Sequence, residues 1–161
     1  MNLGFLGEYE YKVDSKGRLA IPKPFVQNLP SENDQTIRKL VAFGMLETHI
    51  LLYSAPEWVK FSQPILSSHP FNKDRSQQIR EFFQYVTELE LDGQNRIMLP
   101  KRFIERASIK KEVMFLGVNN KIELWDKAAY EKVIEKTGEI KLDNFAQLYE
   151  DFNGGGTPRA K

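Results

Sequence analysis

The chain has 161 residues, 41% of them apolar and 12% aromatic, which is enough for one compact domain or two small ones and excludes disorder along most of its length. Its 23 basic and 22 acidic side chains give a formal net charge of +1, so a nucleic-acid surface can only be a local patch. The chain has no cysteine, which excludes disulfide frameworks, thiolate catalysis and cysteine-ligated zinc.

Apolar and charged residues alternate over residues 9–13, which predicts a half-buried strand near the N-terminus. Asp14 follows this strand, and aspartate opens turns by hydrogen bonding to the nearby backbone. Gly17 freely adopts the positive φ that the fourth residue of such a turn often needs. A short apolar strand then ends at Pro22, whose fixed φ suits the start of a helix, which we expect over residues 23–29.

A polar stretch over residues 28–39 predicts a surface loop. Two further strands are expected after it, over residues 39–43 and 48–53. Ser54 is well placed as the N-cap of a helix that ends near residue 66. The first part of the chain is therefore typical of a β-β-α-β-β unit with a trailing helix.

The chain then repeats itself. Residues 91–103 match residues 13–25 at a constant offset of 78, with Asp, Arg, Pro, Lys and Phe recurring in register. Residues 122–130 match residues 50–58 at an offset of 72. Asn95 takes the place of glycine in the second turn, and asparagine is among the few other residues that adopt positive φ at modest cost. The two copies therefore predict one architecture, with a longer loop in the first copy.

The rest of the chain follows the same alternation of helices and strands. We expect a helix over 72–85 between the copies, a short helix over 101–107, strands over 112–117 and 121–125, and a helix that Asp126 caps and that ends near residue 136. Asn119 and Asn120, between those two strands, are a tight-turn signal. The glycines that follow Asn153 predict a disordered tail.

Basic side chains gather around both turns. The first turn has four basic residues against one acid, a local charge of +3, and the second has four against two, a local charge of +2. Such patches bind phosphates, arginine can also read guanine, and a two-stranded ribbon fits the major groove. The predicted DNA-binding residues are Lys12, Lys16, Arg18 and Lys23 in the first copy and Arg96, Lys101 and Arg102 in the second.

An internal role competes with DNA contact for two of these arginines. Arg18 and Arg96 each follow an aspartate by four residues across the turn, where an ion pair would brace the turn instead. The sequence leaves both roles open. A carboxylate would repel DNA, so we expect the two aspartates to be scaffold, together with the residues that reverse the chain. This scaffold set is Asp14, Gly17, Pro22, Asp92, Asn95 and Pro100.

The pattern Asp-x-x-x-Arg-x-x-x-Pro occurs in both copies, and it resembles that of the MraZ family of bacterial transcriptional regulators over nearly the whole chain. The resemblance implies an α+β fold in which two tandem AbrB-like swapped-hairpin half-domains interleave into one small β-barrel with flanking helices. It also implies a ring-like homo-oligomer that binds double-stranded DNA at promoter direct repeats of the division and cell-wall gene cluster. We therefore expect a cytoplasmic protein associated with the nucleoid.

The resemblance also predicts how the chain is divided. We expect SpoVT/AbrB-like repeats over residues 7–53 and 82–125, connecting helices over 54–81, C-terminal helices over 126–152 and a disordered tail over 153–161. Asn95 departs from the glycine that the family pattern has, and Glu88 and Glu90 make the second entry strand more acidic than the first. If the copies differ in DNA contact, the first is favoured.

No catalytic constellation emerges from the sequence. Asp14 and Asp92 lie beside arginines, which lower a carboxyl pKa and oppose proton transfer. His49 and His69 have no metal-ligand spacing, and Lys16-Gly17 lacks the other residues of a phosphate loop. We expect no enzyme activity, cofactor, metal, membrane contact or small-molecule substrate. The alternative is a structural or protein-interaction oligomer that does not bind DNA.

Overall fold

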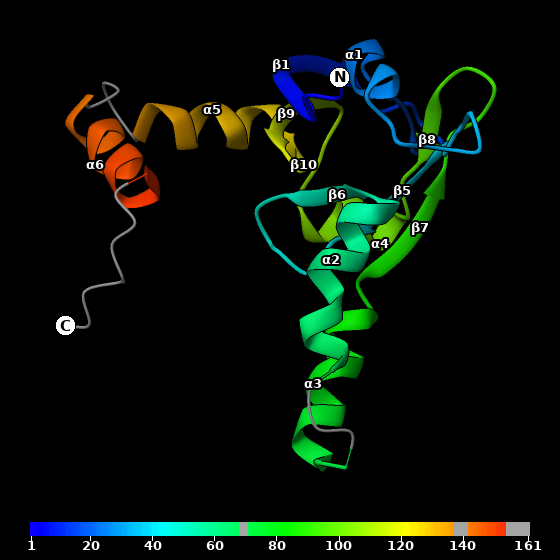
Figure 1. The fold of residues 1–161 in the computed structure, drawn as a ribbon. Coiled ribbons are helices and arrows are strands. Elements are labelled where there is room, and N and C mark those ends of the chain that lie inside the picture. Colours follow the sequence, from blue (N-terminus) through cyan, green and yellow to red (C-terminus); the bar gives the residue numbers. More distant parts are fainter. Residues whose placement is uncertain (68–70, 137–141, 154–161) are drawn as a thin grey trace. The chain divides into compact units, whose positions relative to one another are not determined.

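The computed structural model describes residues 1–67, 71–136 and 142–153 (Figure 1). The chain forms two compact units, residues 1–130 and residues 131–161, and the described strands all belong to the first. Residues 154–161 of the tail that we expected to be disordered lie outside the described part. Asn153, the first residue of that predicted tail, is instead the last residue of a helix.

Six strands form one antiparallel sheet. In spatial order they are β1 (Phe5–Lys12), β9 (Glu112–Asn119), β10 (Lys121–Asp126), β6 (Ile50–Ser54), β5 (Lys39–Phe43) and β7 (Val86–Glu90). Three of the ladders join different copies of the repeat, because β1 pairs with β9, β10 with β6 and β5 with β7. The two copies are therefore interleaved rather than placed one after the other.

A separate two-stranded antiparallel ribbon, here called the central ribbon, consists of β2 (Arg18–Ala20) and β8 (Arg96–Met98). Each turn redirects the chain, so that β2 lies near β1 but pairs with β8 of the other copy. The six-stranded sheet keeps β1 and β7 at its two ends, and no ladder between described residues joins them. The predicted α+β class is confirmed, whereas hydrogen bonding does not close the sheet into the expected barrel.

Two short helices follow the central ribbon, α1 (Lys23–Gln27) and α4 (Lys101–Arg106). Pro22 and Pro100 occupy their N-cap positions with φ of −52° and −60°, so each proline directly precedes a helix. Both helices end slightly earlier than predicted. Both helices lie at the surface of the first unit, where Lys23, Lys101 and Arg102 are exposed.

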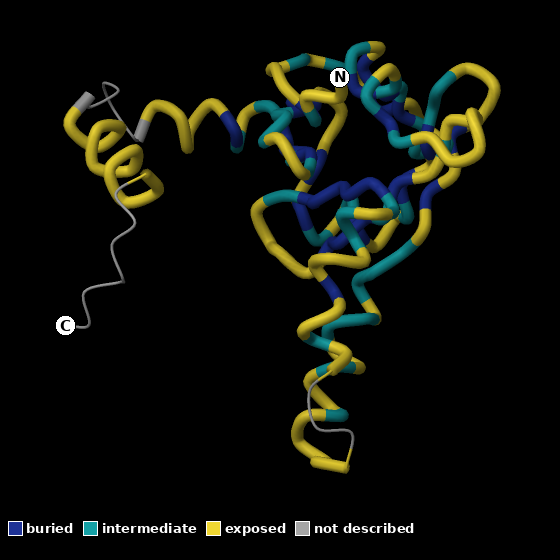
Figure 2. Tube along the Cα trace, in the orientation of Figure 1, coloured by how far each residue is buried: buried dark blue, intermediate teal, exposed yellow. Residues whose placement is uncertain are grey.

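Equivalent residues of the two copies meet in one core. Leu19 and Ile97, the middle residues of the central ribbon, are 0% and 1% exposed. Phe25 and Phe103, from the two short helices, are fully buried, and Phe25 packs edge-on against Phe115 of β9. Figure 2 shows the buried segments concentrated in the sheet and the ribbon. The core therefore fixes the ribbon by one face and leaves its other face outside.

The outer face of β5 and β6 is covered by α2 (Ala55–Leu66) and α3 (Lys73–Phe83), which run together away from the sheet (Figure 1). An aromatic cluster joins these helices to the strands: Phe43 stacks on Phe82 at 4.7 Å, and Trp58 on Phe82 at 6.2 Å. The first of these helices ends at residue 66, as predicted. Two further helices, α5 (Lys127–Lys136) and α6 (Leu142–Asn153), complete the described chain.

Two local predictions need correction. Ser54 lies at the N-cap position, but its side chain makes no capping hydrogen bond. Asp126 does cap its helix, since its Oδ2 accepts from the amide of Ala129 at 3.3 Å.

The loop expected over 28–39 contains a small hairpin of β3 (Ser31–Glu32) and β4 (Gln35–Thr36). The two residues between these strands adopt φ of 51° and 62°, which a tight hairpin turn requires.

Within the described ranges, no helix has both the length and the apolar character that crossing a membrane requires.

Candidate nucleic-acid interface

The first turn is built around the side chain of Asp14. Its Oδ1 accepts hydrogen bonds from the backbone amides of Lys16 and Arg18, both at 2.9 Å. Its Oδ2 accepts from Arg18 Nε at 2.6 Å. Gly17 closes the turn with φ of 81°, and its amide donates to the Asp14 carbonyl at 3.0 Å. The aspartate side chain thus accepts hydrogen bonds from backbone amides of the turn.

The second turn repeats this geometry bond for bond. Asp92 Oδ1 accepts from the amides of Gln94 and Arg96 at 2.9 Å, and Oδ2 accepts from Arg96 Nε at 2.9 Å. Asn95 adopts φ of 60° at the position of Gly17, as the sequence predicted. The bracing contact that the sequence left open for both arginines is therefore present in the structure, and the side-chain hydrogen bonds of both aspartates lie within their own turns.

Both carboxylates are held in their charged form. The amide N–H of Arg18 donates to Asp14 and lowers its carboxyl pKa below the ordinary value of 3.8, and the Arg18 side chain adds to this. The amide of Arg96 does the same for the pKa of Asp92. Hydrogen bonds and a cation that favour the charged carboxylate have this direction. Neither aspartate is suited to proton transfer, which agrees with a structural role.

Each turn is also fastened to the other copy. The Leu99 amide donates to the Gly17 carbonyl at 2.9 Å, and the Ile21 amide donates to the Asn95 carbonyl at 2.9 Å. A Cβ on Gly17 would lie 3.1 Å from the Leu99 carbonyl oxygen, so glycine suits this position. Neither turn can move without disturbing the strand of the other, so the interleaving itself makes the two turns rigid.

The central ribbon presents one face to the outside. Because alternate residues of a strand share a face, Arg18 and Arg96 lie on the opposite side from the buried Leu19 and Ile97. The register places Arg18 opposite Met98, which is 56% exposed, and Arg96 opposite Ala20. The two arginine side chains are 34% and 31% exposed. Within the described residues only the Nε atom of each guanidinium is hydrogen-bonded, so its Nη atoms are available to a ligand.

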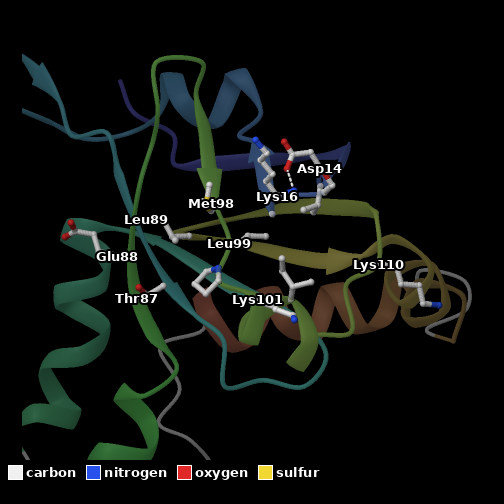
Figure 3. A pocket seen from close by; sticks show the side chains of 14 residues that line it. Asp14, Lys16, Thr87, Glu88, Leu89, Met98, Leu99, Lys101 and Lys110 are labelled. Atoms are coloured by element: carbon white, nitrogen blue, oxygen red, sulfur yellow. Dashed lines mark hydrogen bonds between the residues drawn. The ribbon is translucent and has the colours of Figure 1, made fainter.

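The predicted lysines fall into two groups. Lys16 and Lys101 come from different copies, yet both line one cleft beside the first turn (Figure 3). Lys12, at the end of β1, and Lys23, at the start of α1, are exposed, and neither has an ion-pair partner among the described residues. The arrangement can bind a polyanion, because its cations surround a rigid ribbon.

One predicted residue lies apart from this group. Arg102 has its guanidinium over the Phe103 ring at 5.2 Å, and it lines a separate cleft with Tyr85 and Arg106. The sequence placed Arg102 beside Lys101 only because they are neighbours in the chain. One step along a helix turns a side chain by about a quarter turn or more, which separates the two.

Sequence reasoning missed Arg38. Its Nη2 donates to the Asp92 carbonyl at 2.7 Å and to Asn95 Oδ1 at 2.8 Å, so it lies across the second turn. Lys111 is the equivalent residue of the second copy, because its carbonyl accepts from Val13 as the Arg38 carbonyl accepts from Leu91. Arg38 comes from the loop in which the two copies differ in length, so no repeat signal could have identified it.

No group of three potential metal-ligating side chains occurs in the part of the chain that the structure describes. His49 stacks on the Trp125 ring with 4.2 Å between centroids, which accounts for that histidine as a packed side chain. His69, the other histidine weighed as a ligand, lies outside the described residues.

Comparison with known proteins agrees with the repeat found in the sequence. The model of the MraZ protein family, which its description likens to antitoxins, matches residues 5–81 and again residues 82–152. Proteins named "Transcriptional regulator MraZ" are similar over nearly their whole length. That of Pediococcus pentosaceus is 35% identical over 92% of this chain and 98% of its own, and that of Moorella thermoacetica is 34% identical over 92% and 99%. That of Caldanaerobacter subterraneus subsp. tengcongensis is 31% identical over 92% and 98%. The chain belongs to the MraZ family of transcriptional regulators, which is not a family of enzymes.

Proposed function

We propose that this chain is a sequence-specific DNA-binding transcriptional regulator that contacts DNA through the outer face of the central ribbon and the first turn. The observation that carries the proposal is the pair of partly exposed arginines on the outer face of a two-stranded ribbon. A ribbon of this kind fits the major groove, whose base edges identify every base pair. Membership of a family of regulators supports the same function.

The spacing on the ribbon suits direct readout. Arg18 and Arg96 are diagonal neighbours across the two strands, a relation that places side chains about 7–8 Å apart. This is about two base steps of 3.4 Å, so each guanidinium meets a different base pair. The Nε atom of each arginine binds its aspartate, while the Nη atoms face the ligand. Bracing and DNA contact are therefore compatible roles of one side chain.

Lysines beside the ribbon add phosphate contacts. Lys16 and Lys101 flank its first-turn side, and Lys12 and Lys23 extend the basic surface along β1 and α1. Phosphate contacts supply affinity without sequence information and make binding steeply dependent on salt. The ribbon would select the sequence, and the lysines would hold the duplex against it.

We further propose the assembly and target that the family resemblance implies. The interleaved strand pairs support repeats of the swapped-hairpin AbrB type over 7–53 and 82–125 that jointly enclose one barrel-like core. A ring-like homo-oligomer would offer many ribbons to direct repeats in the promoter of the division and cell-wall gene cluster. Several weak contacts then gain affinity through effective concentration. Such a regulator acts in the cytoplasm, on the nucleoid.

A gel-shift titration tests the proposal, with the protein and the DNA upstream of its own gene between about 50 and 200 mM salt. Replacing two phosphate-binding lysines, Lys16→Ala with Lys101→Ala, should lower the slope of log affinity against log salt by about two units. The control removes two exposed charges at the start of α3, Lys73→Ala with Arg75→Ala, and should leave the slope unchanged. Light scattering checks that both variants keep the oligomer mass of the parent protein.

A second variant separates bracing from DNA contact. We expect Lys16→Ala with Arg18→Ala to abolish binding while circular dichroism and oligomer size stay unchanged. Loss of the fold would assign Arg18 to bracing alone, and the lysine pair would then decide whether DNA binds here. Absence of any shift at the lowest salt, with an intact oligomer, would favour the alternative of a structural or protein-interaction assembly.

A further inference from the structure

A cleft of about 810 Å³ lies between the first turn, β7 and the start of α4. Leu89, Leu99 and Ile104 form its apolar surface, and Lys16, Lys101 and Lys110 contribute to its lining. In the view of Figure 3, Leu99 lies between the side chains of Lys16 and Lys101, and Leu89 lies to the left of them. Sites for small organic ligands have volumes of about 300–1,000 Å³, an apolar lining and a few polar groups.

The equivalent place beside the second turn has larger residues. At the offset of 78, Tyr9 takes the position of Thr87 and Tyr11 that of Leu89. The Tyr9 ring packs on Phe25 of the first copy at 5.2 Å and the Tyr11 ring on Phe115 of the second copy at 5.7 Å, so both tyrosines fill space around the core. Their smaller counterparts on β7 leave room. The cleft thus lies where β7 has smaller residues than β1 has at the two equivalent positions.

The same comparison accounts for the charge of the cleft. Lys16 occupies the position that Gln94 has in the second turn. Lys111 and Arg38 are equivalent residues of the two copies, so Lys110 occupies the position that Ile37 has in the first copy. At these two positions the larger space has lysines, whereas its counterpart has the uncharged residues Gln94 and Ile37.

The acidic residues of the lining do not neutralise these cations. Asp14 is committed to its own turn, and Glu88 binds Lys39 Nζ at 2.9 Å. Lys16 and Lys110 have no ion-pair partner among the described residues, and Lys101 has only an exposed contact of 3.7 Å with Glu105. Exposed pairs of that length contribute little. The three ammonium groups stand on flexible four-carbon chains, which can turn toward a bound anion.

We propose that this cleft binds a small amphipathic organic anion, with its charged head held by Lys16, Lys101 and Lys110 and its apolar part against Leu89, Leu99 and Ile104. Because Lys16 and Lys101 also belong to the proposed DNA surface, a bound anion competes with phosphates there. This regulatory consequence rests on the proposed function, whereas binding of the anion does not. The ligand would act as an effector that releases the regulator from DNA.

Isothermal titration calorimetry of the full chain with 2-naphthyl phosphate, without DNA, tests the site directly. We expect one saturable site per chain, and binding of uncharged 2-naphthol about tenfold weaker or more, because it lacks the charged head. Thr87→Tyr restores the residue of the first copy and should abolish binding by filling the cleft. Lys110→Gln should weaken binding about threefold or more, whereas its neighbour Lys111→Gln, a matched charge change outside the lining, should not.

Three results would overturn the proposal: no binding to the parent protein, equal binding by Thr87→Tyr and Lys110→Gln, or equal affinity for inorganic phosphate, which would exclude the apolar contact. If Thr87→Tyr misfolds by circular dichroism, Lys110→Gln decides, because its side chain is exposed. A gel shift in the presence of 2-naphthyl phosphate then measures competition with DNA. Saturable anion binding by a protein that fails to shift DNA would contradict the proposed function and leave the cleft assignment intact.

Discussion

The two turns of this chain have the same internal hydrogen bonds and different surroundings. In both, an aspartate accepts two amides and an arginine Nε, and a residue with positive φ closes the turn. The first turn carries Lys16 at its tip beside an open cleft. The second carries Gln94, and Arg38 lies across it. The two copies therefore share the hydrogen bonds that form the turn, and they differ in the side chains at its tip and beside it.

This difference indicates a division of roles between the copies. The second turn has additional hydrogen bonds from Arg38, and it has Gln94 at its tip where the first turn has Lys16. These features suit a turn that holds the ribbon in place. A turn with a free lysine and a cleft beside it suits contact with ligands. Since each turn is bonded to the strand of the other copy, the supporting turn also fixes the position of the contacting one.

The largest effect should come from altering the residue that closes the first turn. Gly17→Val places a β-branched side chain at φ of 81°, with its Cβ 3.1 Å from the Leu99 carbonyl, and should lower the free energy of unfolding by about 2 kcal/mol. Chemical denaturation at a fixed protein concentration measures this loss. It tests whether the first turn is as rigid as its bonds indicate.

Gly93→Val is the matched control in the second turn. A Cβ on Gly93 would meet no atom within 4 Å, and this residue does not have positive φ, so the change should stay within about 0.5 kcal/mol. Equal losses in the two variants would contradict the argument from backbone strain.

A smaller loss is expected when the cover of the second turn is removed. Arg38→Ala eliminates the hydrogen bonds to the Asp92 carbonyl and to Asn95 Oδ1, and should cost about 1 kcal/mol of unfolding free energy. The equivalent change in the other copy, Lys111→Ala, should cost no more than about 0.5 kcal/mol, because Lys111 makes no such bond in the described structure. If Lys111→Ala lowered the free energy of unfolding more than Arg38→Ala does, the argument that Arg38 stabilises the second turn would be contradicted.

Acid should reveal what the turns have in common. The pKa values of Asp14 and Asp92 are lowered in the folded chain, so the stability they supply is present above their unfolded pKa of 3.8 and is lost as the pH falls through the folded values. The effect should be modest, because both carboxylates are exposed. Urea midpoints between about pH 5 and pH 2 should fall less steeply for Asp14→Asn and for Asp92→Asn than for the parent. Parallel curves would contradict the lowered pKa values.

Much of this structure could be predicted from the repeat. Both Asp-x-x-x-Arg turns, the positive φ of Asn95 and the strand over 39–43 follow from local chemistry that the sequence displays. The burial of Phe25 and Phe103 follows from their equivalent places behind proline. Local rules succeed here because each feature depends on contacts within a few residues.

The pairing of strands could not be predicted in this way. A hairpin turn normally leads back along its own strand, yet β2 pairs with β8 of the other copy, and this pairing buries Leu19 beside Ile97 in the core. The cleft also depends on which residues of the other copy surround it, so Lys110 was not singled out. Arg38 follows the loop in which the two copies differ in length, and its counterpart is a lysine, Lys111. These features arise from contacts between copies, which no local pattern encodes.

The smallest effect should come from exchanging the residues at the tips of the two turns. Lys16→Gln gives the first turn the residue of the second, and should lower the slope of log affinity against log salt in a DNA gel shift by about one unit, without changing stability. Gln94→Lys makes the reverse exchange. If only the first turn meets phosphates, the added lysine leaves the slope unchanged, because a cation remote from the duplex displaces no counterion. A slope raised by about one unit would instead place both turns on DNA, and the two copies would then differ in rigidity but not in role.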